Sequence, residues 1–187
     1  MGNEIYFQKL APFAEKASAR LNIPMSVILA QWSWESAFGE SDLVKRSNNH
    51  AGIKYIPGVS IAKGKTGMYA DYKDMTQFVD DYVRVMSLGY YAQVRSAVSV
   101  EDTVKALGNS PWAESKYAEG SGVPGANLLR RITEYKLTTY DKAGTPTGNL
   151  DFGSISNRVQ VMSQSDLIKY ATIGLGVVII AGLMGQK

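Results

Sequence analysis

The sequence contains no cysteine and a single histidine, His50. The absence of cysteine excludes disulfide bonds, zinc sites made of thiolates and catalytic thiols. A metal site built from several histidines is excluded as well, and a Ser-His-Asp triad would have to use His50. A lone histidine is more often structural than catalytic, and we expect this of His50. The sequence therefore indicates neither a metal nor an organic cofactor.

The chain also lacks dense clusters of basic residues. Its 20 lysines and arginines are nearly balanced by 17 aspartates and glutamates, so the net charge is +3. A nucleic-acid-binding face would need many more positive charges gathered on one surface, and we expect no nucleic-acid partner. With 187 residues, of which 45% are hydrophobic, the chain is long enough for one folded domain and a short appendage.

Charged residues are absent from one stretch near the C-terminus. Residues 170–184 read YATIGLGVVIIAGLM, without a charged side chain, and a helix over 167–185 would be about 28 Å long. With Lys169 extending towards the headgroups, this length approaches the ~30 Å hydrocarbon core of a bilayer. We interpret 166–187 as a single-pass transmembrane anchor that contacts the lipid bilayer through 167–185. The alternative is a buried terminal helix packed on the domain.

Glycine, serine, threonine and asparagine dominate the stretch before this segment. Residues 142–165 show no sustained hydrophobic period, which is typical of a flexible linker. The predicted organisation is a domain over 1–141, a linker over 142–165 and an anchor over 166–187.

Hydrophobic residues recur at helical spacing through most of the predicted domain. The pattern predicts five helices, at Ile5–Leu21, Pro24–Phe38, Met75–Leu88, Val100–Leu107 and Ala126–Tyr135. The segment 52–72 is rich in glycine and β-branched residues and favours a short two-stranded hairpin. The expected fold class is mainly α, with a small β-hairpin lobe.

The second predicted helix places one carboxylate on an apolar face. Met25, Ile28 and Trp32 form a hydrophobic stripe, and the next position of that stripe is Glu35. Burial beside aromatic rings raises the pKa of a carboxyl and keeps it protonated near neutral pH, as a general acid requires. By spacing alone, a glutamate that reaches solvent or an arginine at the end of its helix is the more common case.

The residues around Glu35 form a longer pattern. The stretch QWSWESAFGESDLVKRSNNHAGIKY contains a helix ending in Glu-Ser, a Gly-x-Ser turn and Asn-Asn-x-x-Gly-Ile-Lys. This pattern resembles the signature of bacterial glucosaminidases of glycoside hydrolase family 73, in the lysozyme-like superfamily. The matching positions are Glu35, Ser36, Gly39, Ser41, Asn48, Asn49, Gly52, Ile53 and Lys54. Weaker matches follow in YADYKDMTQFVDDY, WAESKYAEG and LLRRITEYKLTTYD, so the resemblance covers roughly residues 5–141.

The resemblance implies a lysozyme-like fold and hydrolysis of the β-1,4 glycan strand of peptidoglycan on the N-acetylglucosamine side. It makes Glu35 the general acid that protonates the glycosidic oxygen. The family usually takes a second catalytic group from the hairpin lobe, but 54–68 contains no aspartate or glutamate. Asp71 and Asp74 are the nearest candidates, although carboxylates at such places are more often solvated or cap a helix. A distant carboxylate or the N-acetyl group of the substrate are the alternatives.

Five residues are predicted to bind the glycan strand. Tyr117 matches a tyrosine close to the site in the family, and Asn49 belongs to the Asn-Asn motif. Tyr55, Tyr72 and Trp112 fall in or beside the matching segments and could line a sugar groove. The alternative for each of these aromatics is a place in the core, where large aromatic residues usually pack.

Two other functions are compatible with the same residues. Lytic transglycosylases share the helix-borne Glu-Ser but typically follow it with Gly-Leu-Met-Gln, whereas this chain has Gly-Ile-Lys-Tyr. The missing second carboxylate nevertheless favours their mechanism, in which Glu35 alone is acid and base. The other alternative is a non-catalytic wall-binding membrane protein with the same fold.

The predicted anchor also bears on location. No basic leader followed by an apolar run stands at the N-terminus, so a C-terminal anchor would leave the domain on the cytoplasmic side. A wall hydrolase has no substrate there. We therefore expect a bacteriophage lytic enzyme held in an internal virion membrane, with other virion proteins as further partners. A bacterial autolysin in the cell envelope is the alternative.

Overall fold

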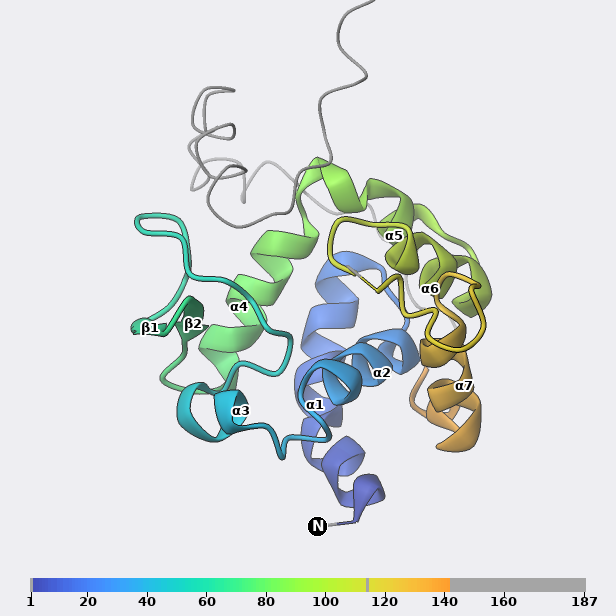
Figure 1. Ribbon diagram of the computed structural model, residues 1–187, viewed down its shortest axis with the longest axis horizontal. Coiled ribbons are helices and arrows are strands. Elements are labelled where there is room, and N and C mark those ends of the chain that lie inside the picture. The colour runs from blue at the N-terminus through green and yellow to red at the C-terminus, as the bar shows by residue number, and fades with distance from the viewer. Residues whose placement is uncertain (1, 114, 142–187) are drawn as a thin grey trace, which may run out of the picture. The chain divides into compact units, whose positions relative to one another are not determined.

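The structure is a computed structural model that describes residues 2–113 and 115–141 (Figure 1). Within these ranges the chain is mainly helical and has one two-stranded antiparallel sheet. The helices are α1 (Asn3–Leu21), α2 (Met25–Glu35), α3 (Asp42–Ser47), α4 (Met75–Met86), α5 (Ala92–Ser96), α6 (Val100–Gly108) and α7 (Ala126–Glu134). The strands are β1 (Gly64–Thr66) and β2 (Tyr69–Asp71), and the short 3₁₀ helices are η1 (Gly89–Tyr91) and η2 (Leu137–Tyr140).

The expected class, mainly α with a small hairpin, is confirmed. The five predicted helices correspond to α1, α2, α4, α6 and α7, and the hairpin lies inside the predicted segment 52–72. The largest difference is that α2 ends at Glu35 and not at Phe38. The hydrophobic pattern does not predict α3 and α5, because such short helices contain too few residues to show a period.

The predicted linker and anchor, 142–165 and 166–187, lie outside the described residues. Within 2–113 and 115–141, no helix combines the length and the apolar character needed to cross a bilayer. The anchor stays a prediction.

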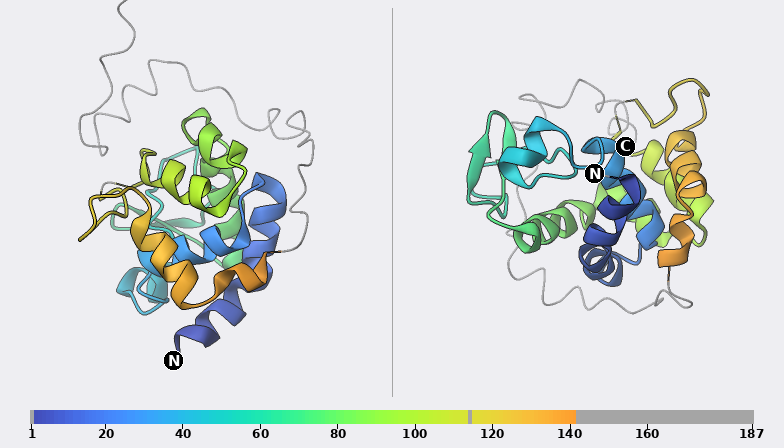
Figure 2. Two further views of the ribbon diagram at one scale, coloured as in Figure 1. Left: turned by 90° about the vertical axis from the view of Figure 1, so that its right-hand side faces the viewer. Right: turned by 90° about the horizontal axis from the view of Figure 1, so that it is seen from below.

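Helix α1 packs against both α2 and α4, and α2 packs against α6 and α7. The hairpin and α3 lie on one side of α1 and α2, whereas α5, α6 and α7 lie on the other, as the views from the front and from below show (Figures 1 and 2). The side chains of α2 from Met25 to Ser33 are all buried. Helix α2 is therefore a core helix, and only its C-terminal end is free to carry a functional group.

A buried carboxylate fastens the hairpin side to α4. Asp81 is 0% exposed and accepts hydrogen bonds from Oη of Tyr72 (2.7 Å), the backbone N of Ile61 (2.9 Å) and Nε of Arg84 (2.6 Å). Tyr72 directly follows β2, and Ile61 precedes β1. Because a buried carboxylate is stable only with several donors, these bonds hold the hairpin in one place against the helices.

Candidate active site

A sharp turn ends α2 immediately after Glu35. Ala37, Phe38 and Gly39 all have positive φ (50°, 55° and 79°), a conformation that is strained for the first two. The backbone N of Phe38 donates to O of Ser33 (2.9 Å) and closes the end of the helix. The chain therefore turns away from α2 and leaves Glu35 as the last helical residue.

Ser36 holds this turn from the inside. Its buried hydroxyl donates to O of Trp32 (2.6 Å) and accepts from N of Gly39 (2.9 Å). Oη of Tyr6 lies 3.1 Å from the same hydroxyl and 3.2 Å from Nδ1 of His50. Since Ser36 has only one proton to donate, Tyr6 donates to Ser36, and the Nδ1–H of His50 donates to Tyr6. The serine of the Glu-Ser motif thus fixes the backbone beside the glutamate.

The carboxyl of Glu35 is half-buried and lies between two segments of the chain. Oη of Tyr117 donates to Oε1 (2.6 Å), while Oε2 faces Gly52, where an added Cβ would lie 3.9 Å from it. Burial raises the pKa of the Glu35 carboxyl, and the hydrogen bond from Tyr117 lowers it in part. This is an environment in which a carboxyl holds its proton longer than it does in water.

The loop that carries Tyr117 contacts α6 through two glycines. A Cβ on Gly108 would lie 2.5 Å from N of Gly125 and 2.7 Å from O of Lys116. The backbone N of Gly125 donates to that same carbonyl (2.9 Å). Backbone segments approach each other this closely only where no side chain intervenes. The two glycines therefore allow the loop to lie close to α6, in the position from which the Tyr117 hydroxyl contacts Glu35.

Asp71 and Asp74, the predicted candidates for the second catalytic group, both have partners of their own. Oδ1 of Asp71 forms an ion pair with Nζ of Lys63 (3.3 Å), and 19% of the Asp71 side chain is exposed. Asp74 caps α4, because its Oδ1 accepts from N of Gln77 (2.8 Å). Neither contacts Glu35 through a hydrogen bond in the described part of the chain, and a catalytic role for either stays a prediction.

Three of the predicted glycan-binding residues lie in the interior, because Tyr117 is 1% exposed and Tyr72 and Asn49 are buried as well. Tyr72 is 0% exposed and donates to Asp81. Asn49 is 1% exposed, and its amide bonds N and O of Ile53 (2.9 and 2.8 Å) and O of Ala70 (3.0 Å). A side chain without exposed surface cannot contact a sugar in this conformation. In this conformation Asn49 and Tyr72 hold the segment around the hairpin and Tyr117 bonds Glu35, so the burial of these three side chains does not support direct contact with the glycan.

Tyr55 and Trp112 are half-buried and keep some exposed surface. Trp112 meets the rings of Tyr82 and Tyr91 edge-on, with centroids 5.6 and 5.8 Å apart. Tyr55 precedes the hairpin, and its backbone N donates to O of Met68 (2.9 Å). Both residues pack in part against the core, and their contact with a glycan stays a prediction.

Trp34 is an aromatic residue beside the site that the sequence patterns do not assign to binding. Its half-buried ring meets the ring of Tyr117 edge-on, with centroids 6.4 Å apart. The guanidinium of Arg131, from α7, lies over the rings of Trp34 (4.8 Å) and Phe38 (4.3 Å) and donates to Oγ of Ser33 (3.2 Å). In the sequence, Trp34 stands directly before Glu35, and this position is the signal that could have identified it.

A family model described as Glucosaminidase, mannosyl-glycoprotein endo-beta-N-acetylglucosaminidase, matches residues 11–136. The chain belongs to this glucosaminidase family. It is therefore a glycosidase, and the resemblance drawn from the Glu-Ser and Asn-Asn motifs is confirmed for this part of the chain. No curated protein sequence matches the chain significantly.

Solved structures similar to this glucosaminidase come from several bacteria. The catalytic domain of the autolysin Auto from Listeria monocytogenes is 23% identical, with a TM-score of 0.56, and the match covers 74% of this chain and 87% of that one. The glycoside hydrolase domain of FlgJ from Salmonella typhimurium is 25% identical (TM-score 0.54; 75% and 96% covered). An N-acetylmuramoyl-L-alanine amidase from Staphylococcus aureus is 22% identical (TM-score 0.60), and the match covers 82% of this chain but 47% of the amidase.

His50 lies in the interior of the glucosaminidase fold. It is 8% exposed, and burial lowers the pKa of its imidazole to about 4. A histidine that stays neutral at physiological pH and bonds a buried tyrosine has a structural role, as the sequence led us to expect.

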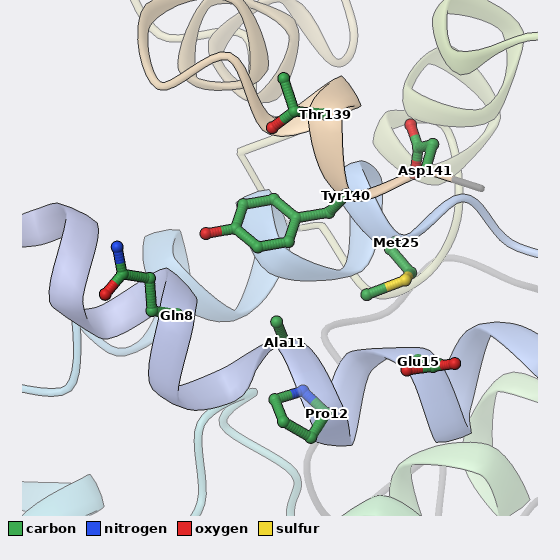
Figure 3. A pocket seen from close by; sticks show the side chains of 8 residues that line it. All are labelled: Gln8, Ala11, Pro12, Glu15, Met25, Thr139, Tyr140 and Asp141. Carbon is green, nitrogen blue, oxygen red and sulfur yellow. The ribbon is translucent and has the colours of Figure 1, made fainter.

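A pocket of about 370 Å³ lies at the other end of α2 (Figure 3). Its lining residues are Gln8, Ala11, Pro12, Glu15, Met25, Thr139, Tyr140 and Asp141. Asp141 accepts a hydrogen bond from N of Ser26 (2.8 Å), at the start of the helix, whereas Glu35 is about 15 Å of helical rise away. The pocket is thus separate from the glucosaminidase site. Within the described ranges, no group of three or more histidines and carboxylates could hold a metal ion.

Proposed function

We propose that this glucosaminidase is a peptidoglycan hydrolase that cleaves the β-1,4 glycan strand on the N-acetylglucosamine side, with Glu35 as the general acid. The observation that carries the proposal is the environment of Glu35, a half-buried carboxyl with a raised pKa at the end of a core helix. An autolysin catalytic domain and a glycoside hydrolase domain are among the similar structures, which supports a wall glycan as the substrate.

The hydrogen bond from Tyr117 gives the two oxygens of Glu35 different roles. Oε1 accepts a hydrogen bond from the Tyr117 hydroxyl. The acidic proton of the neutral carboxyl therefore sits on Oε2, the oxygen that faces Gly52. Transfer of this proton to the glycosidic oxygen breaks the bond between the anomeric carbon and the leaving sugar. The charge then left on Glu35 is stabilised by the same Tyr117 hydroxyl. Water completes the hydrolysis and needs a second group to activate it.

A lytic transglycosylase is the second candidate. Asp71 is paired with Lys63 and Asp74 caps α4, while 54–68 contains no carboxylate at all. This arrangement favours a reaction without an activated water, in which Glu35 serves first as acid and then as base. The product would be an anhydro sugar in place of a reducing end.

The proposal extends to where the enzyme acts. The apolar stretch within 166–187 would hold the protein in a bilayer, with 142–165 as its linker. An internal virion membrane of a bacteriophage gives such an enzyme access to the wall at infection. A bacterial autolysin in the cell envelope is the alternative, and detection of the native protein in uninfected cells, with its domain facing the wall, would favour it.

The test uses the full-length protein and purified peptidoglycan, with the products reduced by borohydride and analysed by mass spectrometry. Fragments ending in reduced N-acetylglucosamine support the glucosaminidase proposal, whereas anhydro-muramyl ends identify a transglycosylase. Glu35→Gln should lower cleavage by about 100-fold or more, because a general acid contributes at least that much. The matched control is Glu40→Gln, at an exposed position near the end of α2. Wall binding without cleavage by the unmodified protein would leave only the non-catalytic alternative.

A further inference from the structure

A chain of hydrogen bonds runs from the core to the Glu35 carboxyl. Oη of Tyr82 donates to Oε1 of Gln31 (2.7 Å), and Nε2 of Gln31 donates to Oη of Tyr117 (3.4 Å). Oη of Tyr117 then donates to Oε1 of Glu35 (2.6 Å). Gln31 is 0% exposed and Tyr82 and Tyr117 are each 1% exposed, so the inner bonds are formed out of contact with bulk water. Gln31 lies one helical turn before Glu35 on α2, on the same face.

The amide of Gln31 gives this chain a direction. An amide has a donor end and an acceptor end, whereas each tyrosine hydroxyl has a single proton that can point either way. With its acceptor end occupied by Tyr82, Gln31 presents its N–H groups to Tyr117. The Tyr117 oxygen then receives a proton from Gln31, and its own proton can only point to Glu35.

The ring of Trp32 packs against the inner end of the chain. The rings of Trp32 and Tyr82 meet edge-on, with centroids 5.2 Å apart. Burial strongly raises the pKa of the Tyr82 hydroxyl and the Trp32 side chain lowers it in small part, although Nε1 of Trp32 has no hydrogen-bond partner among the described residues. Because an indole N–H can only donate, Trp32 offers Tyr82 no acceptor that would compete with Gln31 for the Tyr82 proton.

We propose that Gln31 and Tyr82 are positioning residues of the glycosidase reaction, which hold the Tyr117 hydroxyl as a donor to Oε1 of Glu35. The inference rests on the proposed role of Glu35 as general acid. Without Tyr82, the Gln31 amide can turn its oxygen to Tyr117, and the Tyr117 proton can then point away from Oε1 of Glu35. Without Gln31, the Tyr117 hydroxyl loses the hydrogen bond that strengthens it as a donor. With the chain, Oε1 always accepts, and the acidic proton is kept on Oε2.

The chain also acts during proton transfer. When Oε2 gives its proton to the glycosidic oxygen, the electron pair of the O–H bond stays on the carboxylate as negative charge. A donor already aimed at Oε1 stabilises that charge without reorientation, and a donor that itself accepts a hydrogen bond is a stronger one. Removal of Gln31 or Tyr82 should therefore slow the chemical step without weakening the binding of the glycan.

Both phenols of the chain couple electrostatically to Glu35. Burial is the main cause of the raised pKa of the Glu35 carboxyl, and the Tyr117 hydrogen bond lowers it. Burial is also the main cause of the raised pKa of the Tyr117 and Tyr82 hydroxyls, and the Glu35 charge adds to it. A weaker Tyr117 bond thus shifts the pKa of Glu35 further upwards.

The decisive experiment is an NMR titration of the Glu35 carboxyl carbon in the full-length protein, for Gln31→Met and Tyr82→Phe. Both substitutions keep the size of the side chain and remove one link of the chain. We expect an upward shift of the Glu35 pKa of about half a pH unit to one unit, the equivalent of one ordinary hydrogen bond. The matched control is Tyr91→Phe, which removes the hydroxyl of another buried tyrosine that has no place in the chain. It should leave the titration unchanged.

Kinetics on soluble glycan fragments give a second readout. We expect kcat to fall by about 3- to 10-fold in both variants, with KM unchanged and the alkaline limb of the pH profile moved to higher pH. Thermal unfolding identifies a variant that has lost its fold. If one of the two variants does not fold, the titration and kinetics of the other test the proposal. The proposal is overturned if a folded variant titrates like Tyr91→Phe while Tyr117→Phe shifts the pKa upwards, or if Tyr117→Phe itself has no effect. The titration needs no substrate. The titration therefore tests the hydrogen-bond chain whether or not Glu35 is the general acid, whereas cleavage that survives in Glu35→Gln would overturn the proposed function.

Discussion

Burial helps Glu35 keep its proton, as a general acid requires, and makes it a less favourable residue for the fold. A carboxyl whose pKa is raised by folding contributes stability below its unfolded pKa, and that contribution is lost as the pH rises through the folded pKa. We therefore predict that Glu35→Gln raises the melting temperature at pH 7. At pH 4 the wild-type carboxyl is largely protonated, so the two proteins should differ less. Thermal unfolding at both pH values measures the effect.

The control for this prediction is the exposed Glu40, whose pKa is lowered by the hydrogen bond and ion pair with Lys45. Its neutralisation in Glu40→Gln should give no stabilisation at pH 7. If Glu40→Gln raised the melting temperature as much as Glu35→Gln, the effect would reflect total charge and not the burial of one carboxyl.

His50 has the opposite relation to pH. Its pKa falls from 6.5 in the unfolded chain to about 4 in the fold, because burial disfavours the imidazolium. Stability is therefore intact above pH 6.5 and is lost as the pH falls towards 4, by up to about 3 kcal/mol. We predict that His50→Asn, whose amide N–H can replace the Nδ1–H bond to Tyr6, makes stability less dependent on pH in this range.

Urea unfolding of the wild type and of His50→Asn at pH 7.5 and pH 4.5 checks this prediction. Carboxylates titrate in the same way in both proteins. The loss of unfolding free energy between pH 7.5 and pH 4.5 should therefore differ between the two proteins only by the contribution of His50. If both proteins lost the same amount of unfolding free energy, the imidazole would be charged in the fold or would not titrate in this range.

At the scale of the elements, the contact between α6 and the loop of Tyr117 is the most sensitive to substitution. A Cβ on Gly108 would lie 2.5 Å from the backbone N of Gly125 and 2.7 Å from O of Lys116, and neither atom can rotate away. We predict that Gly108→Ala destabilises the fold by about 1–3 kcal/mol. It should also displace Tyr117 and lower kcat, since the loop must shift to make room.

Melting temperature and glycan cleavage are the two measurements for Gly108→Ala. Gly89→Ala is the matched control, because a Cβ at Gly89 would have no atom within 4 Å. Wild-type stability and cleavage in Gly108→Ala would mean that α6 and the loop do not pack as closely as the structure indicates.

The elements were predictable from the sequence because their signals are local. A stripe of apolar residues predicts α2 and places Glu35 on its inner face, and the hairpin follows from glycine and β-branched residues. The end of α2 was not predictable, because Phe38 continues the hydrophobic pattern but adopts positive φ. That conformation depends on Ser36 and on Tyr6, which comes from α1.

Contacts between distant residues explain the remaining differences. Tyr72 and Tyr117 both match family segments. Tyr72 is buried beside the hairpin, whereas Tyr117 bonds the carboxyl of Glu35, which is 82 positions away in the sequence. Burial of this kind depends on how whole elements pack, which a single sequence does not encode in any local pattern. Gln31 has a weak signal of its own, since it stands four residues before Glu35. Its importance emerges only once Tyr82 and Tyr117 are placed beside it.

At the scale of the whole molecule, the apolar C-terminal stretch leads to the last prediction. The full chain should float with phosphatidylcholine vesicles, and it should stay bound in high salt, because hydrophobic insertion is not screened by ions whereas attraction through a net charge of +3 would be. A fragment of residues 1–165 should remain in the soluble fraction.

Val177, near the centre of 167–185, allows a sharper version of this experiment. A charge at the centre of a span costs about 2.5–3.5 kcal/mol on insertion scales, so Val177→Arg should weaken vesicle binding, while the matched Val177→Leu should retain it. The alternative of a terminal helix packed on the domain predicts the reverse pattern. In that case the full chain would not float, and Val177→Arg would instead lower the melting temperature by placing a charge in a protein core. Flotation and thermal unfolding of the same two variants therefore distinguish an enzyme tethered to a membrane from one with a terminal helix packed on its domain.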